Sequence, residues 1–286
     1  MNISDLATNN IIRNLIPKPI HPILWNIACL GTDVFDLLLK RRDELTPPCK
    51  LRCGVGHYAD IHSYKEKGEV NVEFLTSLGG VKPSDDVLDV GCGCGKEAAY
   101  LTKYLYRSSR YEGFDVAPQA IEWCKTYISS RYPNFHFQTA DVFNKRYNPH
   151  GKFRASEYRF PYGNESFDVV CLFSVFTHML PQDMENYLLE ITRVLKVDGR
   201  CFITFFLLNR DSLESINGKK SALDFKHDFG LYRTVNPNTP EESLCYDEEF
   251  VLGLYEKYNL KIKHLRYGSW SRTKYREQDI IVALKK

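Results

Sequence analysis

Nine residues, VLDVGCGCG at positions 87 to 95, constrain the fold of this 286-residue chain more than any other segment. An aliphatic run ends at Asp89, a helical pattern (KEAAYLTKYL) begins at Lys96, and between them stand three glycines at alternate positions: Gly91, Gly93 and Gly95. This order predicts a strand, a tight turn and a helix. Glycine tolerates positive φ and leaves the backbone open to a ligand. In open α/β sheets, such a turn at the carboxyl end of a strand is where nucleotides bind.

The same order of strand and helix recurs along the chain. Strand patterns end at Asp115 (residues 111 to 116) and at Asp141 (residues 135 to 143), and a fourth strand with its loop is expected within 166 to 179. A helix, a turn and a fifth strand fit 191 to 206, and a helix and two further strands fit the segments from residue 247 onward. Strands that alternate with helical patterns indicate βαβ units and a mainly parallel sheet.

The glycine motif and the order of these segments resemble the class I S-adenosylmethionine-dependent methyltransferases over about residues 66 to 208. A dinucleotide fingerprint does not fit, because Lys96 occupies the position of its last glycine. The resemblance implies an α/β fold with a Rossmann-like seven-stranded sheet, mostly parallel with the last strand antiparallel. It also implies S-adenosylmethionine as cofactor and S-adenosylhomocysteine as product.

The resemblance further assigns residues to the cofactor. Asp115 would hold the ribose hydroxyls, Asp141 would take the adenine amino group, and Val142 would lie beside the ring. Tyr58 and Tyr64 precede the sheet and are candidates to close over the methionine end, although a turn with surface aromatics fits them equally. The other candidate cofactor contacts are Asp89, Gly91, Gly93, Gly95, Val116 and Phe173.

Two regions lie outside the core motifs. Residues 1 to 65 are expected to form an N-terminal helical cap, with helical patterns at about 6 to 16 and 23 to 40. Residues 66 to 286 would form the methyltransferase domain, in which 209 to 246 is an insertion after the fifth strand, expected to cover the substrate.

The insertion is the main clue to the acceptor. Its aromatic and basic residues would suit an organic molecule with an apolar body and polar edges, or the basic residues are simply solvated charges. The candidate acceptor contacts are Phe176, Phe225, Phe229 and Tyr232. For a hydroxyl acceptor, His178 in the loop after the fourth strand is the first candidate for general base and His227 the second. A structural His178, hydrogen-bonded to backbone, is the alternative.

Missing motifs narrow the substrate class. The loop after the fourth strand reads Phe173-Ser174-Val175-Phe176, without the Pro-Pro-aromatic or Pro-Cys signatures of enzymes that act on nucleic acid bases, and without the carboxylates of the metal-dependent type. We therefore expect a metal-independent O-methyltransferase that acts on a small molecule in secondary-metabolite or sugar tailoring. N- or C-methylation of a small molecule, or an RNA or protein methyltransferase, are the alternatives.

Composition sets further limits. A formal charge of +2 predicts no general attraction to nucleic acid. Nine cysteines without a CxxC pair favour a reduced, cytoplasmic protein, and Cys49 and Cys53 alone cannot form a four-ligand zinc site, so no metal is expected. The apolar segment 23 to 39 contains Asp33 and Asp36 and is expected to be an amphipathic or core helix, not a membrane span. The sequence leaves the oligomeric state open.

Overall fold

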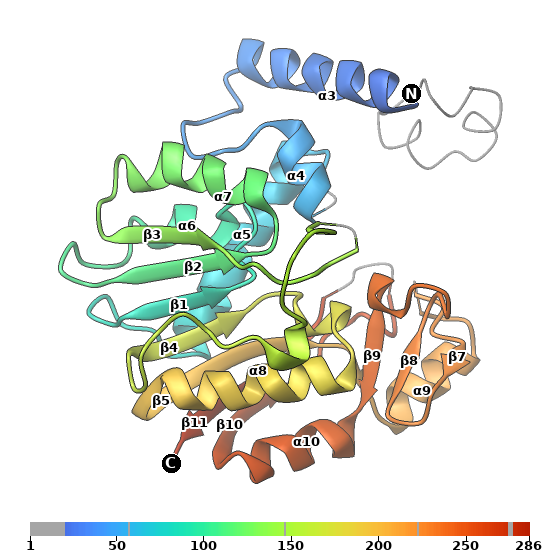
Figure 1. Ribbon diagram of the computed structural model, residues 1–286. Helices are drawn as coiled ribbons and strands as arrows, with labels where there is room; N and C mark the ends of the chain where they lie inside the picture. The colour runs from blue at the N-terminus through green and yellow to red at the C-terminus, as the bar shows by residue number, and fades with distance from the viewer. Residues whose placement is uncertain (1–20, 57, 146, 222, 274–276) are drawn as a thin grey trace.

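Seven strands form the central sheet of the protein, shown here by a computed structural model that describes residues 21–56, 58–145, 147–221, 223–273 and 277–286 (Figure 1). The strand order is β10-β11-β5-β4-β1-β2-β3. The bounds are β1 Val87–Val90, β2 Tyr111–Asp115, β3 Phe135–Thr139, β4 Phe167–Leu172, β5 Leu195–Phe205, β10 Leu260–Arg266 and β11 Asp279–Lys285. Neighbours from β5 to β3 are parallel, whereas β11 is antiparallel to both β5 and β10. The predicted fold class is confirmed.

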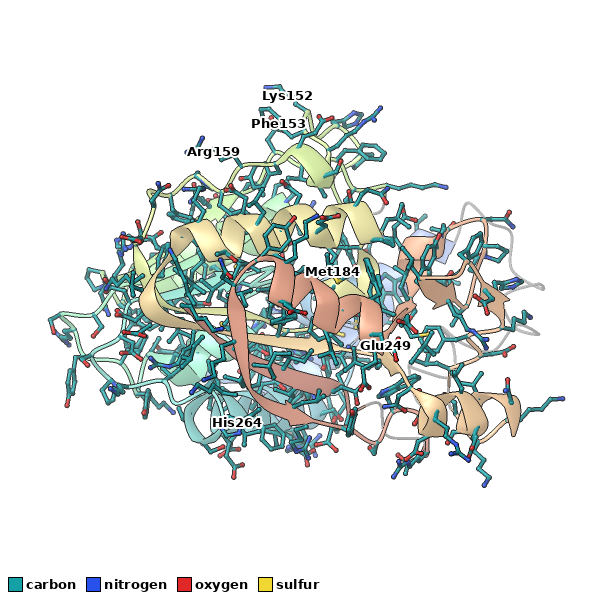
Figure 2. All side chains as sticks on the ribbon, turned by 90° about the horizontal axis from the view of Figure 1, so that it is seen from below. Lys152, Phe153, Arg159, Met184, Glu249 and His264 are labelled. Carbon is teal, nitrogen blue, oxygen red and sulfur yellow. The ribbon has the colours of Figure 1, made fainter. Side chains whose placement is uncertain are left out.

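Helices cover both faces of this sheet, which is why β1 is buried at every residue and β4 at every residue but Asp168. One face carries α5 (Ile61–Ser77), α6 (Lys96–Leu101) and α7 (Pro118–Cys124), which continues as a π-helical turn, η2 (Lys125–Ser129). The other face carries α8 (Pro181–Val194) and α10 (Glu248–Lys257). Seen from below, α8 and α10 lie side by side across the sheet, with Met184 buried beneath them (Figure 2).

The insertion folds as a small subdomain with a sheet of its own. Its elements are β6 Leu207–Leu208, α9 Arg210–Asn217, β7 His227–Asp228, β8 Tyr232–Thr234, the short helix η5 Pro240–Glu242 and β9 Leu244–Asp247. The four strands pair in the order β6-β9-β8-β7 around a core that includes Phe206, Phe225 and Trp270. Because β6 follows β5 directly, the subdomain lies at the carboxyl end of the parallel strands (Figure 1).

The N-terminal region contains α3 (His21–Leu38) and α4 (Cys49–Gly56); the helix expected at 6 to 16 falls outside the described residues. Of the two expectations for α3, an amphipathic or a core helix, the core helix is wrong. Most of its apolar side chains are exposed, including Ile27, Leu30 and Leu38, and the helix lies apart from the sheet in Figure 1. The expected domain boundary at residue 65 falls inside α5, and the division into domains stays a prediction. None of the described helices has the length and apolarity needed to cross a membrane.

Candidate cofactor and acceptor site

The glycine turn has the backbone conformation that its sequence predicts. The φ angles of Gly91, Gly93 and Gly95 are 78°, 54° and 74°, values that non-glycine residues rarely adopt. The N–H groups of Gly91 and Cys92 both donate to the carbonyl of Phe114, at 2.8 and 3.1 Å, which ties the turn to the end of β2. The turn therefore lies at the carboxyl edge of the sheet, where β1 and β2 end together.

Asp115 joins the end of β2 to this turn. Its carboxylate accepts the N–H of Gly93 at 2.9 Å and the N–H of Ala117 at 2.8 Å. Burial raises the pKa of Asp115, and hydrogen bonds from these backbone N–H groups oppose that shift. A carboxylate has about four acceptor sites, so Asp115 can hold the turn and still accept ribose hydroxyls, the role that the sequence predicts for it.

Asp89 lies deeper in the protein than the other acidic residues of the site. Its side chain is buried in β1, and the hydroxyl of Tyr111 donates to it at 2.6 Å. Burial, followed by the nearby charge of Glu97, raises the pKa of Asp89 to about 8. This position suits support of the turn from within the sheet. Direct contact of Asp89 with the cofactor stays a prediction.

Tyr58 and Tyr64, the candidates to close over the methionine end, lie beside the glycine turn. The Tyr64 hydroxyl is 3.6 Å from the sulfur of Cys94, and the two tyrosine rings meet edge to face with centroids 5.8 Å apart. The ammonium group of Lys96 lies 5.3 Å from the centre of the Tyr58 ring. These contacts bring the segment before the sheet against the turn, as closure over the methionine end requires.

Val55 of α4 is a neighbour of the turn that the sequence did not indicate. A Cβ atom on Gly93 would lie 2.9 Å from a methyl group of Val55. The N-terminal cap therefore reaches the glycine turn through α4, although α3 lies farther away. No local pattern could reveal this contact, because residues 55 and 93 belong to separate elements.

The end of β3 lies at the same edge, next to β2. The sequence predicts that this strand ends at Asp141, but in the structure it ends two residues earlier, at Thr139. Asp141 accepts the backbone N–H of Lys152 at 3.2 Å and lies 3.5 Å from its ammonium group, and Val142 is buried. Lys152 projects from the loop that follows β3 (Figure 2). The adenine roles of Asp141 and Val142 stay predictions.

The remaining predicted cofactor contacts are partly buried. Val116 follows Asp115 and packs against the core on the α8 face of the sheet. Phe173 follows β4 and packs on Phe202, with ring centroids 5.2 Å apart. Both residues lie at the carboxyl edge of the sheet, and their contact with a cofactor stays a prediction.

His178 is the last residue of the short helix η4 (Phe176–His178), which follows β4. Its Nδ1 atom is 3.0 Å from the carbonyl oxygen of Glu241 in the insertion. A carbonyl oxygen can only accept, so Nδ1 donates and a neutral His178 carries its lone pair on Nε2. The insertion thus orients His178 in the tautomer that a general base at Nε2 needs.

The insertion also forms hydrogen bonds to the backbone at η4. The hydroxyl of Tyr246, on β9, donates to the carbonyl of Phe176 at 3.1 Å and to the carbonyl of Met179. Phe176 itself is fully buried and packs on Phe205. Its prediction as an acceptor contact conflicts with this enclosed position, which suits a packing role.

The sequence suggests that the aromatic residues of the insertion form one wall against the acceptor. In the structure they do not. Phe225 is fully buried, with Phe206 and Trp270 as ring neighbours, because the subdomain needs a core of its own. Phe229 and Tyr232 instead stack face to face, with centroids 5.1 Å apart, and Phe229 is 50% exposed. The stacked pair is therefore more accessible to an acceptor than Phe225.

His227 lies on β7, the outermost strand of the insertion sheet. β9 contacts η4, and β8 lies between β9 and the strand of His227. No contact brings His227 to the loop that carries His178 among the described residues. Its role as second candidate base stays a prediction.

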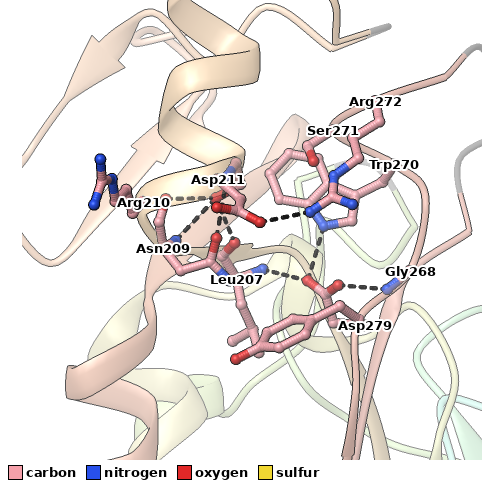
Figure 3. A pocket seen from close by; sticks show the side chains of 11 residues that line it. Leu207, Asn209, Arg210, Asp211, Gly268, Trp270, Ser271, Arg272 and Asp279 are labelled. Carbon is pink, nitrogen blue, oxygen red and sulfur yellow. Dashed lines mark hydrogen bonds and ion pairs between the residues drawn. The ribbon is translucent and has the colours of Figure 1, made fainter.

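A cavity of about 260 Å³ lies where the insertion begins, beside the segment that follows β10 (Figure 3). Asp279 lines it and accepts the N–H groups of Leu207, Gly268 and the Trp270 indole, at 2.7 to 2.8 Å. Burial raises the pKa of Asp279 to about 6. Arg272 and Asp211 form an ion pair of 2.7 Å in the wall of the cavity. The sequence indicated none of these polar residues, because they come from segments about 60 residues apart.

Known proteins share the fold and the motif. Residues 88–203 match the sequence profile of a methyltransferase domain family. The O-methyltransferase cnsE of Penicillium expansum is 29% identical over 198 residues, which cover 67% of this chain and 62% of that protein. The chain thus spans less than two thirds of the length of this relative.

Solved structures agree with the sheet topology. PH0226 of Pyrococcus horikoshii superimposes with a TM-score of 0.56 at 16% identity, covering 82% of this chain and 96% of that one. The 1,6-didemethyltoxoflavin-N1-methyltransferase of Burkholderia thailandensis, solved with S-adenosylhomocysteine, gives a TM-score of 0.50 at 17% identity, over 83% and 84% of the two chains. Together with the strand order and the glycine turn, these matches show the fold of the chain, and residues 88–203 correspond to a methyltransferase domain.

Proposed function

We propose that the protein transfers the methyl group of S-adenosylmethionine to a hydroxyl group of a small organic acceptor, in the tailoring of a natural product. One observation carries the cofactor half of this proposal: the positive-φ glycine turn, Asp115, Tyr58 and Tyr64 all lie together at the carboxyl edge of the sheet. The name of the Penicillium relative supports the O-methyl half.

In this reaction the acceptor oxygen attacks the sulfonium methyl carbon in line. The new O–C bond forms as the S–C bond breaks, S-adenosylhomocysteine leaves, and the hydroxyl proton passes to a base. Alignment of the two reactants is worth roughly 7 to 11 kcal/mol. The proposal assigns alignment of the cofactor to the glycine turn and Asp115, and the proton to Nε2 of His178. The reaction as proposed needs no metal ion.

The acceptor would lie between the turn and the insertion. The residues that support this position are His178 in η4 and Glu241 in η5, whose contact joins the loop after β4 to the insertion. The stacked pair Phe229 and Tyr232 and the cavity beside Asp279 are the candidate surfaces for an apolar body and for a polar edge of the acceptor. A molecule of moderate size with both features fits this description.

Asp115→Ala tests the cofactor site. Loss of a charged hydrogen-bonding group costs roughly 1.5 to 3 kcal/mol, so the affinity for S-adenosylhomocysteine is expected to fall roughly tenfold to a hundredfold. Titration calorimetry with the purified protein measures it. Glu112→Gln is the matched control, because Glu112 lies on the same strand and pairs with His136 instead of the turn. Unchanged affinity in a folded Asp115→Ala variant would refute the assignment.

The acceptor site is tested by replacing Phe229 and Tyr232 together with alanine. Once an acceptor is found by screening hydroxyl-bearing small molecules with labelled methyl donor, its KM is expected to rise or turnover to disappear, while S-adenosylhomocysteine binding changes little. Tyr106→Ala, an exposed aromatic residue outside the insertion, is the control. Methyl incorporation into nitrogen, carbon or RNA instead of a hydroxyl would contradict the proposed reaction, and protein stabilised by NAD but not by S-adenosylhomocysteine would contradict the cofactor.

A further inference from the structure

Three cysteines meet between α3 and α4, one of them at least 20 residues before the other two. Cys49 and Cys53 lie one turn apart on α4, and Cys29 faces them from α3. All three side chains are buried, and their sulfur atoms lie within 4.8 Å of one another. The sequence alone offered two thiols at this place, because nothing in its spacing connects Cys29 with the pair 20 residues later.

The spacing of the sulfur atoms fits a tetrahedral metal site. Zinc–thiolate bonds are about 2.3 Å long, so two thiolates on one tetrahedral zinc ion lie about 3.8 Å apart. The sulfur atoms of Cys49 and Cys53 are 3.7 Å apart. The third sulfur would have to move by about 1 Å or less to reach the same spacing. Soft thiolate ligands of this kind select zinc over harder divalent cations.

A buried ion pair lies beside the cluster. The guanidinium of Arg52 is fully buried and pairs with Asp36 at 3.3 Å. The Nε atom of Arg52 is buried without a hydrogen-bond partner among the described residues.

Asp33 is a candidate of suitable type for a fourth ligand. It lies one turn after Cys29 on α3, on the same helix face. Its carboxylate accepts the backbone N–H of Cys49 at 2.9 Å, which places it at the edge of the cluster. Structural zinc sites are almost always four-coordinate, and a rotated Asp33 or a water molecule would complete this one.

The attachment of α3 to the rest of the protein depends on the contacts around these three cysteines. Of residues 23–38 in α3, Cys29 and Asp36 alone are buried. Asp36 pairs with Arg52 at 3.3 Å, and Cys29 packs in a small apolar cluster with Cys49, Cys53, Trp25 and Ala59. Such a small core contributes little stability, and small units of this kind commonly need a metal or a disulfide.

We propose that Cys29, Cys49 and Cys53 bind one zinc ion, which fastens α3 to α4 next to the glycine turn. On binding, the thiols release their protons to the buffer and no electron is transferred. The role is structural, since the ion would lie in the cap and not among the residues assigned to methyl transfer. The inference does not depend on the proposed reaction.

Cobalt titration of the full chain tests this site. Protein freed of metal under reducing conditions is expected to take up one Co²⁺ per chain, with the intense thiolate-to-cobalt absorption and the visible bands of tetrahedral geometry. Zn²⁺ should displace Co²⁺ and raise the unfolding temperature. Alanine variants of Cys29, Cys49 and Cys53 are each expected to lose at least tenfold in affinity. Cys201→Ala and Cys245→Ala, which remove buried thiols elsewhere, should bind as the wild type does.

A second measurement needs no variant. Zn²⁺ is expected to protect Cys29, Cys49 and Cys53 from alkylation by iodoacetamide, read residue by residue by mass spectrometry, and to leave the alkylation rates of the other cysteines unchanged. Absence of thiolate–cobalt absorption in reduced protein would overturn the proposal. So would a Cys29→Ala variant with full affinity, because the bridge between α3 and α4 would then not exist.

Discussion

Replacement of His178 by alanine is expected to lower turnover by roughly 10² to 10⁴, the usual contribution of a general base, while S-adenosylhomocysteine affinity stays unchanged. The reason is the orientation of the ring: Nδ1 donates to the carbonyl of Glu241, so Nε2 carries the lone pair that accepts a proton. Initial rates and titration calorimetry separate the two quantities. Turnover of the wild type should also fall on acidification, because protonation removes that lone pair.

A structural role of His178 would give a different result. His178→Asn keeps an amide N–H that can donate toward Glu241 but has no base, so it should be as slow as His178→Ala if the histidine takes the proton. Recovery of turnover in His178→Asn would show that the bond to the insertion is what matters. His136→Ala, an exposed histidine on β3, is the control. If His178→Ala retained more than about half of the wild-type turnover, His178 would not be a general base with the usual contribution. His227 would then be the next candidate for the base.

Gly93→Val is expected to reduce S-adenosylhomocysteine affinity by more than about a hundredfold, beyond the upper range for loss of one charged hydrogen bond. Its φ of 54° disfavours a β-branched residue, and even the Cβ atom would lie 2.9 Å from Val55. The added methyl groups would also occupy the space that the glycine leaves open for the cofactor. Calorimetry measures the loss, and circular dichroism shows whether the variant is folded.

Gly253→Ala is the control for this substitution. Gly253 lies in α10, and a Cβ atom there would meet nothing within 4 Å, so alanine should leave binding unchanged and can stabilise the helix. Gly93→Ala should lose less S-adenosylhomocysteine affinity than Gly93→Val, because alanine has the same φ penalty but a smaller side chain. Normal cofactor affinity in folded Gly93→Val would contradict the role assigned to the glycine turn.

Local patterns were sufficient for most of the fold. The alternation of apolar runs with helical stripes predicted the parallel strands and the helices between them, because hydrophobic periodicity reports which side of each element faces a core. The positive φ angles of Gly91, Gly93 and Gly95 follow from the turn that their spacing demands. Resemblance to a family assigned Asp115 to the ribose and Tyr64 to the methionine end of the cofactor; both assignments stay predictions, and both side chains contact the glycine turn.

In the insertion, local patterns did not predict which side chains are buried. Its aromatic residues suggested one acceptor wall, but Phe225 is buried in a core completed by Trp270, a residue from another segment, while Phe229 remains on the surface with Tyr232. Composition indicates that a segment is rich in aromatic residues. It does not indicate which of them will be needed to fill a core, because that depends on partners distant in the sequence.

The sequence by itself determined the class of sheet, the glycine turn and the edge at which a cofactor can bind, since each depends on residues that are neighbours in the chain. The tertiary structure alone decided that Glu241 orients His178, that Asp279 lines a cavity, and that Cys29 joins Cys49 and Cys53. Each of these contacts joins segments at least 20 residues apart. Burial and hydrogen bonding between such segments arise when the whole chain packs, so no local spacing encodes them.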